Sequence, residues 1–325
     1  MRHQSILVVG GSGFIGHAIV AQLVDRGCRV IVPTRRYAHA RDLLPLPTVD
    51  VVEADVHDAS TLMQLVSRCD AVINLVGILH SRPGDPYGPD FARAHVDLPR
   101  AIVSAMRAQG VRRFLHMSAL GAASDAPSMY LRSKADGEAA ARNGLSGEGG
   151  IDWTIFRPSV VFGPDDHFIN LFAKLARWFP VLPIGGARAR FQPIHVMDVA
   201  RAFVNALDER ETIGKTYVLA GPRVYTLREL VRMASIASGH PRPVLPLPDA
   251  LARLQAWMLE HLPGTPLMSR DNLDSMRVDN VAPPGWTPPK ELGLDRLVPL
   301  ESGVTQTFAG TPEAALSQYR TRARR

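Results

Sequence analysis

The sequence predicts an α/β protein in which a doubly wound parallel sheet is interleaved with a smaller C-terminal lobe. Three observations predict this class. Short apolar runs alternate with segments of helical period through the first half of the 325 residues. A glycine-rich turn joins the first apolar run to the first helical segment. Beyond residue 160 the alternation loosens, and prolines cluster at 241–248 and 283–289.

The chain begins with a predicted strand, turn and helix. Residues 5–9 (SILVV) form a short apolar run typical of a buried parallel strand, and apolar residues recur at helical spacing over 14–23. A second strand is predicted at 29–34 (RVIVPT). The turn carries Gly10-x-x-Gly13-x-x-Gly16. Glycines at this spacing allow a tight turn, the approach of backbone amides to a pyrophosphate, and close packing of helix on strand.

This arrangement predicts a Rossmann-type dinucleotide-binding domain. The start of the helix offers unpaired N–H groups and a partial positive charge to the phosphates. A glycine turn with only a structural role is the alternative, but the flanking strands and helix favour binding. The residues expected around the pyrophosphate are Gly10, Gly13, Phe14, Ile15 and Gly16.

The residues after the second strand indicate which dinucleotide binds. An acidic residue here would accept a hydrogen bond from the ribose 2′-hydroxyl of NAD. The sequence instead has Arg35 and Arg36, whose guanidinium groups suit a 2′-phosphate. NADP(H) is therefore favoured over NAD(H), although one of the two arginines can be an ordinary solvated charge.

Two more strands, predicted at 49–53 and 70–75, bring polar residues to the same edge of the sheet. Asp55 follows the first strand and can accept from the adenine amino group, whereas capping of the next helix or a turn is the alternative. Asn74 and Gly77 end the second strand, where the chain would pass the pyrophosphate and ribose.

A candidate catalytic group follows the strand predicted at 111–117. Ser118 lies at its carboxyl end, and Tyr130 and Lys134 begin the next helix four residues apart, on one helix face. A lysine cation beside a phenol stabilises the phenolate and is expected to lower the tyrosine pKa. Such a tyrosine exchanges a proton with a substrate hydroxyl or carbonyl. Ser118 would hold the substrate oxygen, and Lys134 would bind the nicotinamide ribose.

These motifs resemble the extended type of the short-chain dehydrogenase/reductase superfamily over residues 6 to 230. The resemblance rests on the glycine turn and on Asp55-Val56, Asn74-Leu-Val-Gly77, Ser118, Tyr130-x-x-x-Lys134, Arg157-Pro158-Ser-Val-Val-Phe162-Gly163 and His195-Val-Met-Asp198-Val-Ala200. Residues 116–121, 130–138 and 162–166 resemble an atypical subgroup. That subgroup includes the nucleotide-binding accessory subunit of respiratory complex I, bacterial NAD(P)-binding relatives, and members linked to ubiquinone synthesis.

The resemblance extends the expected site. It implies that Val56, Val76 and Pro158 also contact the cofactor, with Tyr130 and Lys134 at the nicotinamide ribose.

Two departures disfavour a nucleotide-sugar substrate. Ser118 is followed by Ala-Leu-Gly121, and only 12 positions separate it from Tyr130. The helix asparagine usual in such enzymes is replaced near His95, which we expect to be a partly exposed packing residue, with a proton relay as the alternative.

The second half is expected to form the substrate or partner lobe. Residues 168–181 predict a helix whose broad apolar face either walls the substrate pocket or packs in the core. Thr226 with Glu229 predicts a capping box. Residues 250–262 predict a helix with an apolar stripe, for which a core-facing orientation is favoured and docking on a membrane surface or partner is the alternative. The stripe consists of Leu251, Leu254, Trp257, Met258 and Leu262.

The expected limits of the NADP(H)-binding domain are 1–160, with returning segments near 190–222. The interleaved substrate or partner lobe is expected mainly at 161–325, and it ends in a basic tail at 318–325.

Composition excludes several classes of protein. With 46% hydrophobic and 21% charged residues the chain is typical of globular proteins. Its net charge of +6 is accompanied by no zinc-finger spacing, RNA-binding aromatic motif or long basic helix, so neither nucleic acid nor a metal is an expected partner.

Cys28 and Cys69 cannot form a disulfide framework. The longest apolar run, 71–79, is too short to span a bilayer. A cytoplasmic location is expected, with peripheral contact at the inner face of a membrane as the alternative.

The favoured function is an NADP(H)-dependent oxidoreductase acting on a small apolar carbonyl or alcohol, including a quinone-related one. The alternative is a non-catalytic, cofactor-bound accessory or assembly subunit of a respiratory complex. A nucleotide-sugar epimerase or dehydratase is the second alternative.

Overall fold

The computed structural model describes residues 3–143, 150–166, 168–262, 264 and 266–308. The chain forms two compact units, each assembled from segments that are distant in sequence. The first unit contains the chain up to Pro158, Met197–Leu219 and Gly285–Arg296. The second contains Ser159–Val196, Ala220–Pro284 and the chain from Leu297 onward. The basic tail expected at 318–325 lies outside the described residues.

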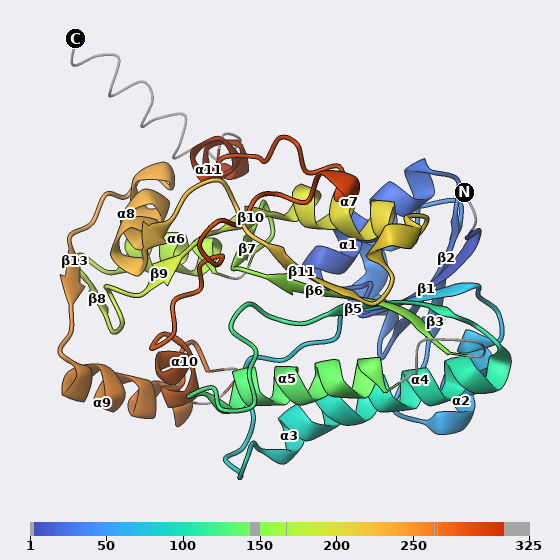
Figure 1. The fold of residues 1–325 in the computed structure, drawn as a ribbon. Helices are drawn as coiled ribbons and strands as arrows, with labels where there is room; N and C mark the ends of the chain where they lie inside the picture. Colours follow the sequence, from blue (N-terminus) through green and yellow to red (C-terminus); the bar gives the residue numbers. More distant parts are fainter. Residues whose placement is uncertain (1–2, 144–149, 167, 263, 265, 309–325) are drawn as a thin grey trace. The chain divides into compact units, whose positions relative to one another are not determined.

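A parallel sheet forms the centre of the first unit (Figure 1). In the described part of the chain it has seven strands in the order β11-β6-β5-β4-β1-β2-β3. The order reverses between β1 and β4, so ligands are expected beyond the carboxyl ends of these strands. This architecture confirms the predicted Rossmann-type α/β fold. The strands are β1 (Ser5–Val9), β2 (Arg29–Thr34), β3 (Val49–Glu53), β4 (Ala71–Asn74), β5 (Arg113–Met117), β6 (Asp152–Pro158) and β11 (Lys215–Leu219).

Helices cover both faces of this sheet (Figure 1). One face carries α2 (Ala59–Val66), α4 (Leu98–Gln109) and α5 (Met129–Arg142), and the other carries α1 (Phe14–Asp25) and α7 (Val196–Ala206). The strands are apolar on both sides because both sides are covered. Side chains of β1, β4, β5, α2 and α4 meet in one buried core cluster. Shorter helical turns complete the unit: η1 (Tyr37–Leu43), α3 (Pro89–Phe91), η2 (Ala92–Asp97), η3 (Arg210–Thr212) and η4 (Lys290–Leu292).

The second unit is built from helices and short strand pairs. Its core lies between α6 (Ile169–Trp178) and α8 (Leu227–Ala237), and α6 buries Ile169 and Phe172 there. The predicted capping box is confirmed, since Thr226 and Glu229 cap α8 reciprocally. The strands are β7 (Val161–Phe162), β8 (Leu182–Ile184), β9 (Arg190–Phe191), β10 (Ile194–His195), β12 (Tyr225–Thr226) and β13 (Val244–Pro246), and the remaining helices are α9 (Asp249–Glu260), α10 (Arg270–Ser275) and α11 (Leu300–Phe308).

Helix α9 corrects one expectation. The apolar stripe that was expected to face the core is exposed; Leu254 and Trp257, for example, are 52% and 46% exposed. The helix packs instead through Ala252 and Ala256, which are buried. Ala252 comes so close to Gly185 that a Cβ on this glycine would lie 2.6 Å from the Cβ of Ala252. Only small residues allow this close approach, so the large apolar side chains point away.

In the part of the chain that the structure describes, no helix combines the length and apolar character needed to cross a membrane.

Candidate functional site

The glycine turn after β1 forms a cradle that is tightly packed at Gly10 and Gly16. Gly10 has a positive φ of 85°, and its carbonyl accepts a hydrogen bond of 3.1 Å from the Gly13 amide. A Cβ on Gly16 would lie 2.5 Å from the carbonyl oxygens of Gly10 and Gly11. Helix α1 begins at Phe14 without a side-chain cap and without an acidic residue in its first turn. Its first amides, including those of Phe14 and Ile15, can therefore receive a pyrophosphate.

Two exposed arginines follow β2 at the same edge of the sheet. The side chain of buried Thr34 fixes the loop, because its hydroxyl donates to the Arg36 carbonyl at 3.0 Å. No carboxylate among the described residues pairs with the guanidinium group of Arg35 or Arg36. Both groups are thus available to a phosphate at the end of β2.

Asp55 shapes the turn after β3 and does not cap a helix. Its carboxylate accepts from the His57 amide at 3.0 Å and lies 3.7 Å from Arg93. Asp58 is the N-cap of α2 instead, and the hydrogen bonds it accepts from Ser60 and Thr61 lower its pKa to about 2. Neighbouring Val56 packs against the core of the sheet. Burial and the charge of Arg93 lower the pKa of His57.

The end of β4 approaches the glycine cradle. Asn74 is buried and accepts from the Val76 amide at 3.2 Å, while its side-chain amide donates to His116 at 3.3 Å. A Cβ on Gly10 would lie 3.2 Å from the Val76 amide nitrogen, so the two turns are in close contact. A Cβ on Gly77 would lie 3.5 Å from Nζ of Lys134. The end of β4 therefore connects the cradle with α5.

Lys134 is a buried cation with spare donors. Its Nζ donates to the Met117 carbonyl at 3.0 Å, the one hydrogen bond of this group within the described residues. Desolvation lowers its pKa to about 8. An ammonium group has three N–H donors, so two remain for hydroxyl or phosphate oxygens of a ligand.

Tyr130 behaves differently from the expectation. Its ring packs against the rings of Phe91 and His95, with centroids 6.0 and 5.6 Å away. Burial raises its pKa to about 12, so the expected lowering by Lys134 is wrong for this structure. The ammonium group of Lys134 binds the Met117 carbonyl, and desolvation of the phenol dominates. The phenol of Tyr130 is therefore protonated at neutral pH.

The hydroxyl of Ser118 is engaged within the protein. It donates to the carboxylate of Glu138 at 2.6 Å, and both residues are buried. Glu138 also accepts from Arg157 at 2.6 Å and from Arg142 at 2.7 Å. With two guanidinium groups beside it, Glu138 remains an acceptor, so Ser118 offers a ligand its lone pairs and not its hydrogen. Glu138 was not singled out from the sequence because a glutamate on a helix is usually a solvated charge.

His95 is buried and not partly exposed as expected, with 1% of its surface accessible. Its Nδ1 lies 2.8 Å from the hydroxyl of Ser133, and its Nε2 accepts from the Ile78 amide at 3.0 Å. The Ser133 hydroxyl donates to the Tyr130 carbonyl, so Nδ1 carries the hydrogen of His95. Burial lowers the pKa of His95 to about 2, so it stays neutral and holds the loop after β4 to α5. The proton-relay alternative receives no support from this arrangement.

The structure thus brings most of the candidate residues to one edge of the sheet, in the first unit. Pro158 ends β6 at this edge, and its carbonyl accepts from the Leu120 amide at 2.9 Å. The backbone amides of the cradle and the spare donors of Lys134 fit a nicotinamide dinucleotide. Among the described residues no cluster of His, Cys, Asp and Glu could hold a metal ion.

Comparisons with known proteins agree with this geometry. The model of the NAD dependent epimerase/dehydratase family matches residues 6–220. The mouse protein named NADH dehydrogenase [ubiquinone] 1 alpha subcomplex subunit 9, mitochondrial, is 33% identical over 303 residues, which cover 90% of this chain and 77% of that protein. The Caulobacter vibrioides ceramide reductase is 30% identical over 304 residues, covering 89% and 90%. A solved UDP-glucuronic acid 4-epimerase from Bacillus cereus, in complex with UDP-glucuronic acid and NAD, has a TM-score of 0.69, 19% identity, and coverage of 94% and 98%.

Proposed function

This chain belongs to the NAD dependent epimerase/dehydratase family, and we propose that it is an NADP(H)-binding oxidoreductase that reduces a small, apolar carbonyl compound. The family includes oxidoreductases and epimerases, and the ceramide reductase is a relative of nearly the same length. The observation that carries the proposal is the buried ammonium group of Lys134, which has two donors to spare at the edge of the sheet where Rossmann-type proteins bind nicotinamide dinucleotides.

The choice of NADP(H) rests on the end of β2. Arg35 and Arg36 have no carboxylate partners among the residues described, and no acidic side chain follows the strand directly. A 2′-phosphate would form charge-assisted hydrogen bonds with these guanidinium groups. A bare 2′-hydroxyl would find no acceptor on either side chain.

The protonated phenol of Tyr130 suits the reduction of a carbonyl. The nicotinamide of a bound NADPH supplies a hydride. The phenol of Tyr130, with its pKa near 12, stays protonated and can donate a hydrogen bond and then its proton to a substrate oxygen. Lys134, on the same face of α5, holds the ribose with its spare donors and stabilises the phenolate that remains. Ser118 only accepts hydrogen bonds, so Tyr130 alone would polarise a carbonyl.

Equilibrium binding tests the cofactor part of the proposal. NADPH should bind the wild type more tightly than NADH, as measured by the fluorescence of the reduced nicotinamide. Lys134→Met, which keeps the length of the chain but removes its donors, should weaken NADPH binding about tenfold or more. Lys174→Met, on exposed α6 surface, is the matched control and should bind as the wild type does. Absence of NADPH binding, or an equal effect of both variants, would overturn the proposal.

Turnover tests the catalytic part. NADPH oxidation is followed in the presence of aldehydes, ketones and quinones. Tyr130→Phe should lower kcat by about 10² or more, because a general acid contributes about 10²–10⁴, and should leave NADPH affinity unchanged. A Tyr130→Phe variant with wild-type turnover would contradict the role of the phenol.

A second candidate function is a cofactor-bound accessory subunit of a respiratory complex at a membrane. The observation that favours it is the engagement of Ser118 by Glu138, which leaves the site one donor short for carbonyl reduction. The mouse relative carries the name of a subunit of a respiratory enzyme. This candidate predicts NADPH binding without turnover of any carbonyl, and loss of cellular respiratory function in Gly16→Ala but not in Tyr130→Phe. The oxidoreductase proposal predicts the opposite response to Tyr130→Phe.

A further inference from the structure

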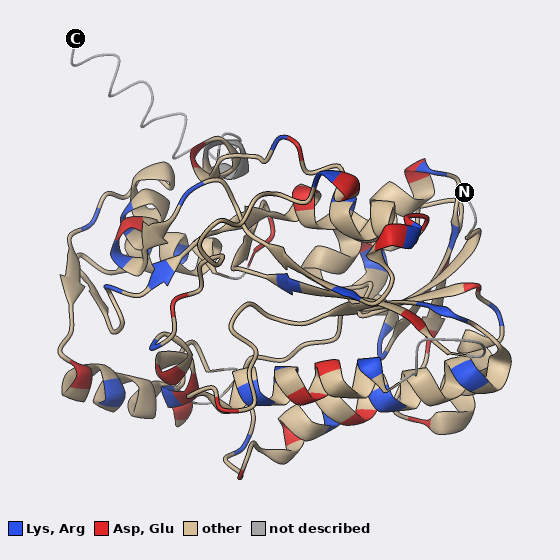
Figure 2. Cartoon of the chain, in the orientation of Figure 1, with Lys and Arg blue, Asp and Glu red and all other residues tan. Residues whose placement is uncertain are grey.

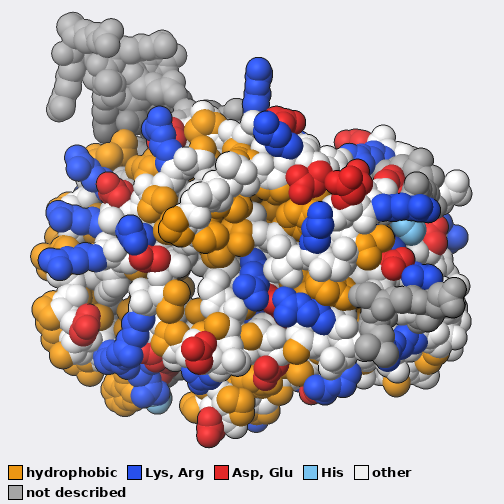
Figure 3. Space-filling model, viewed as in Figure 1, with side chains coloured by type: hydrophobic (Ala, Val, Ile, Leu, Met, Phe, Trp, Pro, Cys, Tyr) orange, Lys and Arg blue, Asp and Glu red, His pale blue; other side chains and the backbone are white. Residues whose placement is uncertain are grey.

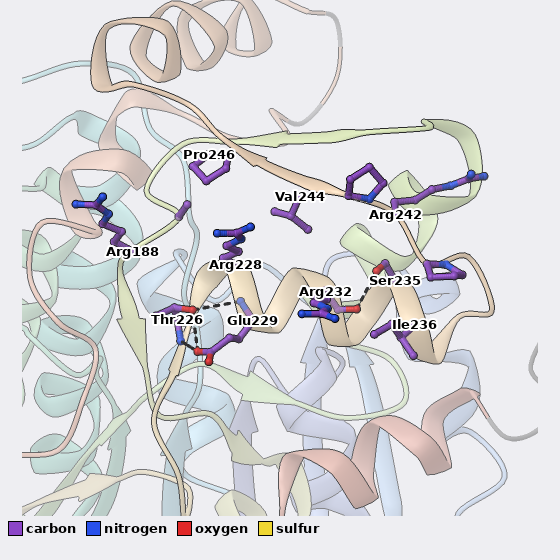
Figure 4. Close-up of a pocket in the computed structure, with 13 residues that line it drawn as sticks. Arg188, Thr226, Arg228, Glu229, Arg232, Ser235, Ile236, Arg242, Val244 and Pro246 are labelled. Atoms are coloured by element: carbon purple, nitrogen blue, oxygen red, sulfur yellow. Dashed lines mark hydrogen bonds between the residues drawn. The ribbon is translucent and has the colours of Figure 1, made fainter.

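An open cavity of about 850 Å³ lies between α8 and β13 in the second unit (Figure 4). Its lining combines arginines with prolines and aliphatic side chains and contains no aromatic ring. The residues that the argument uses are Arg188, Arg228, Arg232, Ile236, Val244 and Pro246.

Three of the four arginines that line this cavity have no ion-pair partner among the described residues. Arg188, Arg228 and Arg232 are exposed, and none forms an ion pair within the described part of the chain. In Figure 4 Arg228 points from α8 into the space beneath Val244 and Pro246. Arg228 and Arg232 are four residues apart on α8, a spacing at which like charges destabilise a helix. The fold gains nothing visible from this repulsion, which points to a role in binding an anion.

Glu229, the acidic residue in the lining, does not neutralise these arginines. The carboxylate of Glu229 accepts from the amide and the hydroxyl of Thr226, both at 2.7 Å, and thereby caps α8. The fourth arginine, Arg242, donates to the Ala176 carbonyl at 2.9 Å and contributes its charge at the rim. The cavity therefore keeps a net positive charge.

The positive charge extends over the surrounding segments. Residues 168–196 and 220–262 contain nine Lys and Arg but three Asp and Glu. Figure 2 shows these basic residues in blue on α6, α8 and their connections. A surface with this excess attracts anions.

Apolar surface adjoins the cavity. Ile236, Val244 and Pro246 line it, whereas exposed Leu245 lies between the last two on β13 and points to the other side of the strand. The next element of the chain after β13 is α9, whose apolar stripe is also exposed. On the face seen in Figure 3, hydrophobic side chains gather at the lower left, and basic side chains stand along the left margin above them.

We propose that this cavity binds the phosphate group of an anionic ligand, for which a lipid headgroup is the source that the lining favours. Guanidinium groups bind phosphate oxygens in pairs. Arg228 and Arg232 hold the phosphate, Arg188 adds a third charge, and the apolar part of the ligand covers Ile236 and Val244. The absence of an aromatic ring in the lining disfavours a nucleotide, whose base would lack a stacking partner.

Vesicle binding by the full-length protein tests the proposal. The protein should sediment with vesicles of phosphatidylcholine and phosphatidylglycerol at physiological ionic strength, and not with phosphatidylcholine alone. Arg228→Gln with Arg232→Gln should weaken this binding about tenfold or more. Lys174→Gln with Arg223→Gln removes two charges of the same unit outside the cavity and should have little effect. NADPH affinity and thermal unfolding should be unchanged in both double variants, so the result is independent of the proposed function.

Calorimetry with inorganic pyrophosphate distinguishes the source of the phosphate. Pyrophosphate binding that is lost in the Arg228 and Arg232 double variant, without vesicle binding, supports the phosphate site and assigns it a water-soluble ligand. Vesicle binding that depends on the same two arginines assigns it a lipid. An equal loss in the two double variants, or binding of neither probe by the wild type, overturns the proposal.

Discussion

The hydroxyl of Ser118, the residue directly after β5, donates to the carboxylate of Glu138 at 2.6 Å. Arg157 and Arg142 complete the contacts of this carboxylate. The pair couples the candidate site to the interior, because a change at Glu138 alters both a buried charge network and the hydrogen-bonding state of Ser118.

Removing the charge of Glu138 should destabilise the protein more than removing its contact with Ser118. Glu138→Gln leaves Arg157 and Arg142 without a counter-charge, and we expect a loss of about 3 kcal/mol, near the lower end for a broken buried pair because both arginines are partly exposed. Ser118→Ala should cost about 1–2 kcal/mol. Urea unfolding measures both, with exposed Glu211→Gln as the control. A Glu138→Gln variant as stable as this control would contradict the network.

Substitutions at two glycines of the cradle should affect stability and cofactor binding to different extents. Gly16→Ala places a Cβ 2.5 Å from two carbonyl oxygens, so it should lower the free energy of unfolding by about 2 kcal/mol or more and abolish NADPH binding. The nearest contact of a Cβ on Gly13 is 3.3 Å, and its φ of −89° suits any residue. Gly13→Ala should therefore weaken NADPH binding with a loss of stability below about 1 kcal/mol. Equal stability losses in the two variants would refute the described cradle.

The arginines after β2 should set the preference between cofactors. Arg35→Gln with Arg36→Gln should raise the Kd for NADPH about tenfold to a hundredfold, since two charge-assisted contacts with the 2′-phosphate are lost. The Kd for NADH should change little, because NADH lacks that phosphate. Fluorescence titrations with both cofactors measure the ratio. If both affinities fall together, the arginines act on the fold and not on the phosphate.

Two buried histidines should make the protein sensitive to acid. Burial lowers the pKa of His95 to about 2 and that of His116 to about 3, from the ordinary value of 6.5. The folded values are depressed, so below pH 6.5 the unfolded chain takes up protons that the folded chain does not. Stability should therefore be full above pH 6.5 and fall toward pH 3, by up to about 1.4 kcal/mol per pH unit for each histidine.

Urea unfolding at pH 7 and pH 5 measures this slope. His116→Gln should make it shallower, whereas exposed His39→Gln should not alter it. A stability that is constant between these pH values would mean that the histidines are not buried as described.

The orientation of α9 is open to a simple test. Leu254→Gln should change the free energy of unfolding by less than about 0.5 kcal/mol, as exposed substitutions do. Ala256→Leu should cost about 1–3 kcal/mol through overpacking, because Ala256 is fully buried. The reverse ranking would restore the core-facing orientation that the sequence pattern favours.

Much of the fold could be predicted from local pattern. The limits of β1 and β2 agree with the predicted strands at 5–9 and 29–34, because a buried parallel strand is an apolar run bounded by turn residues. The strand predicted at 111–117 begins two residues later, at Arg113, since the ends of an apolar run do not fix where pairing starts. The capping box of α8 was readable because it is local.

The candidate site was less predictable. The positions of Ser118, Tyr130 and Lys134 follow from sequence spacing, and their roles remain predictions. The pKa of Tyr130 could not be read from its spacing to Lys134, because it depends on the rings that desolvate the phenol. The orientation of α9 likewise depends on which side of the helix meets Gly185.

By itself the sequence determined the parallel α/β fold, the glycine turn and the basic end of β2, because strand pattern, glycine spacing and residue type at a strand end act over a few neighbouring residues. Only the tertiary structure decided the protonation of Tyr130, the engagement of Ser118 by Glu138, the burial of His95 and the exposure of the α9 stripe. These properties depend on desolvation and on contacts between residues far apart in the chain. Neither of these can be predicted from a few neighbouring residues.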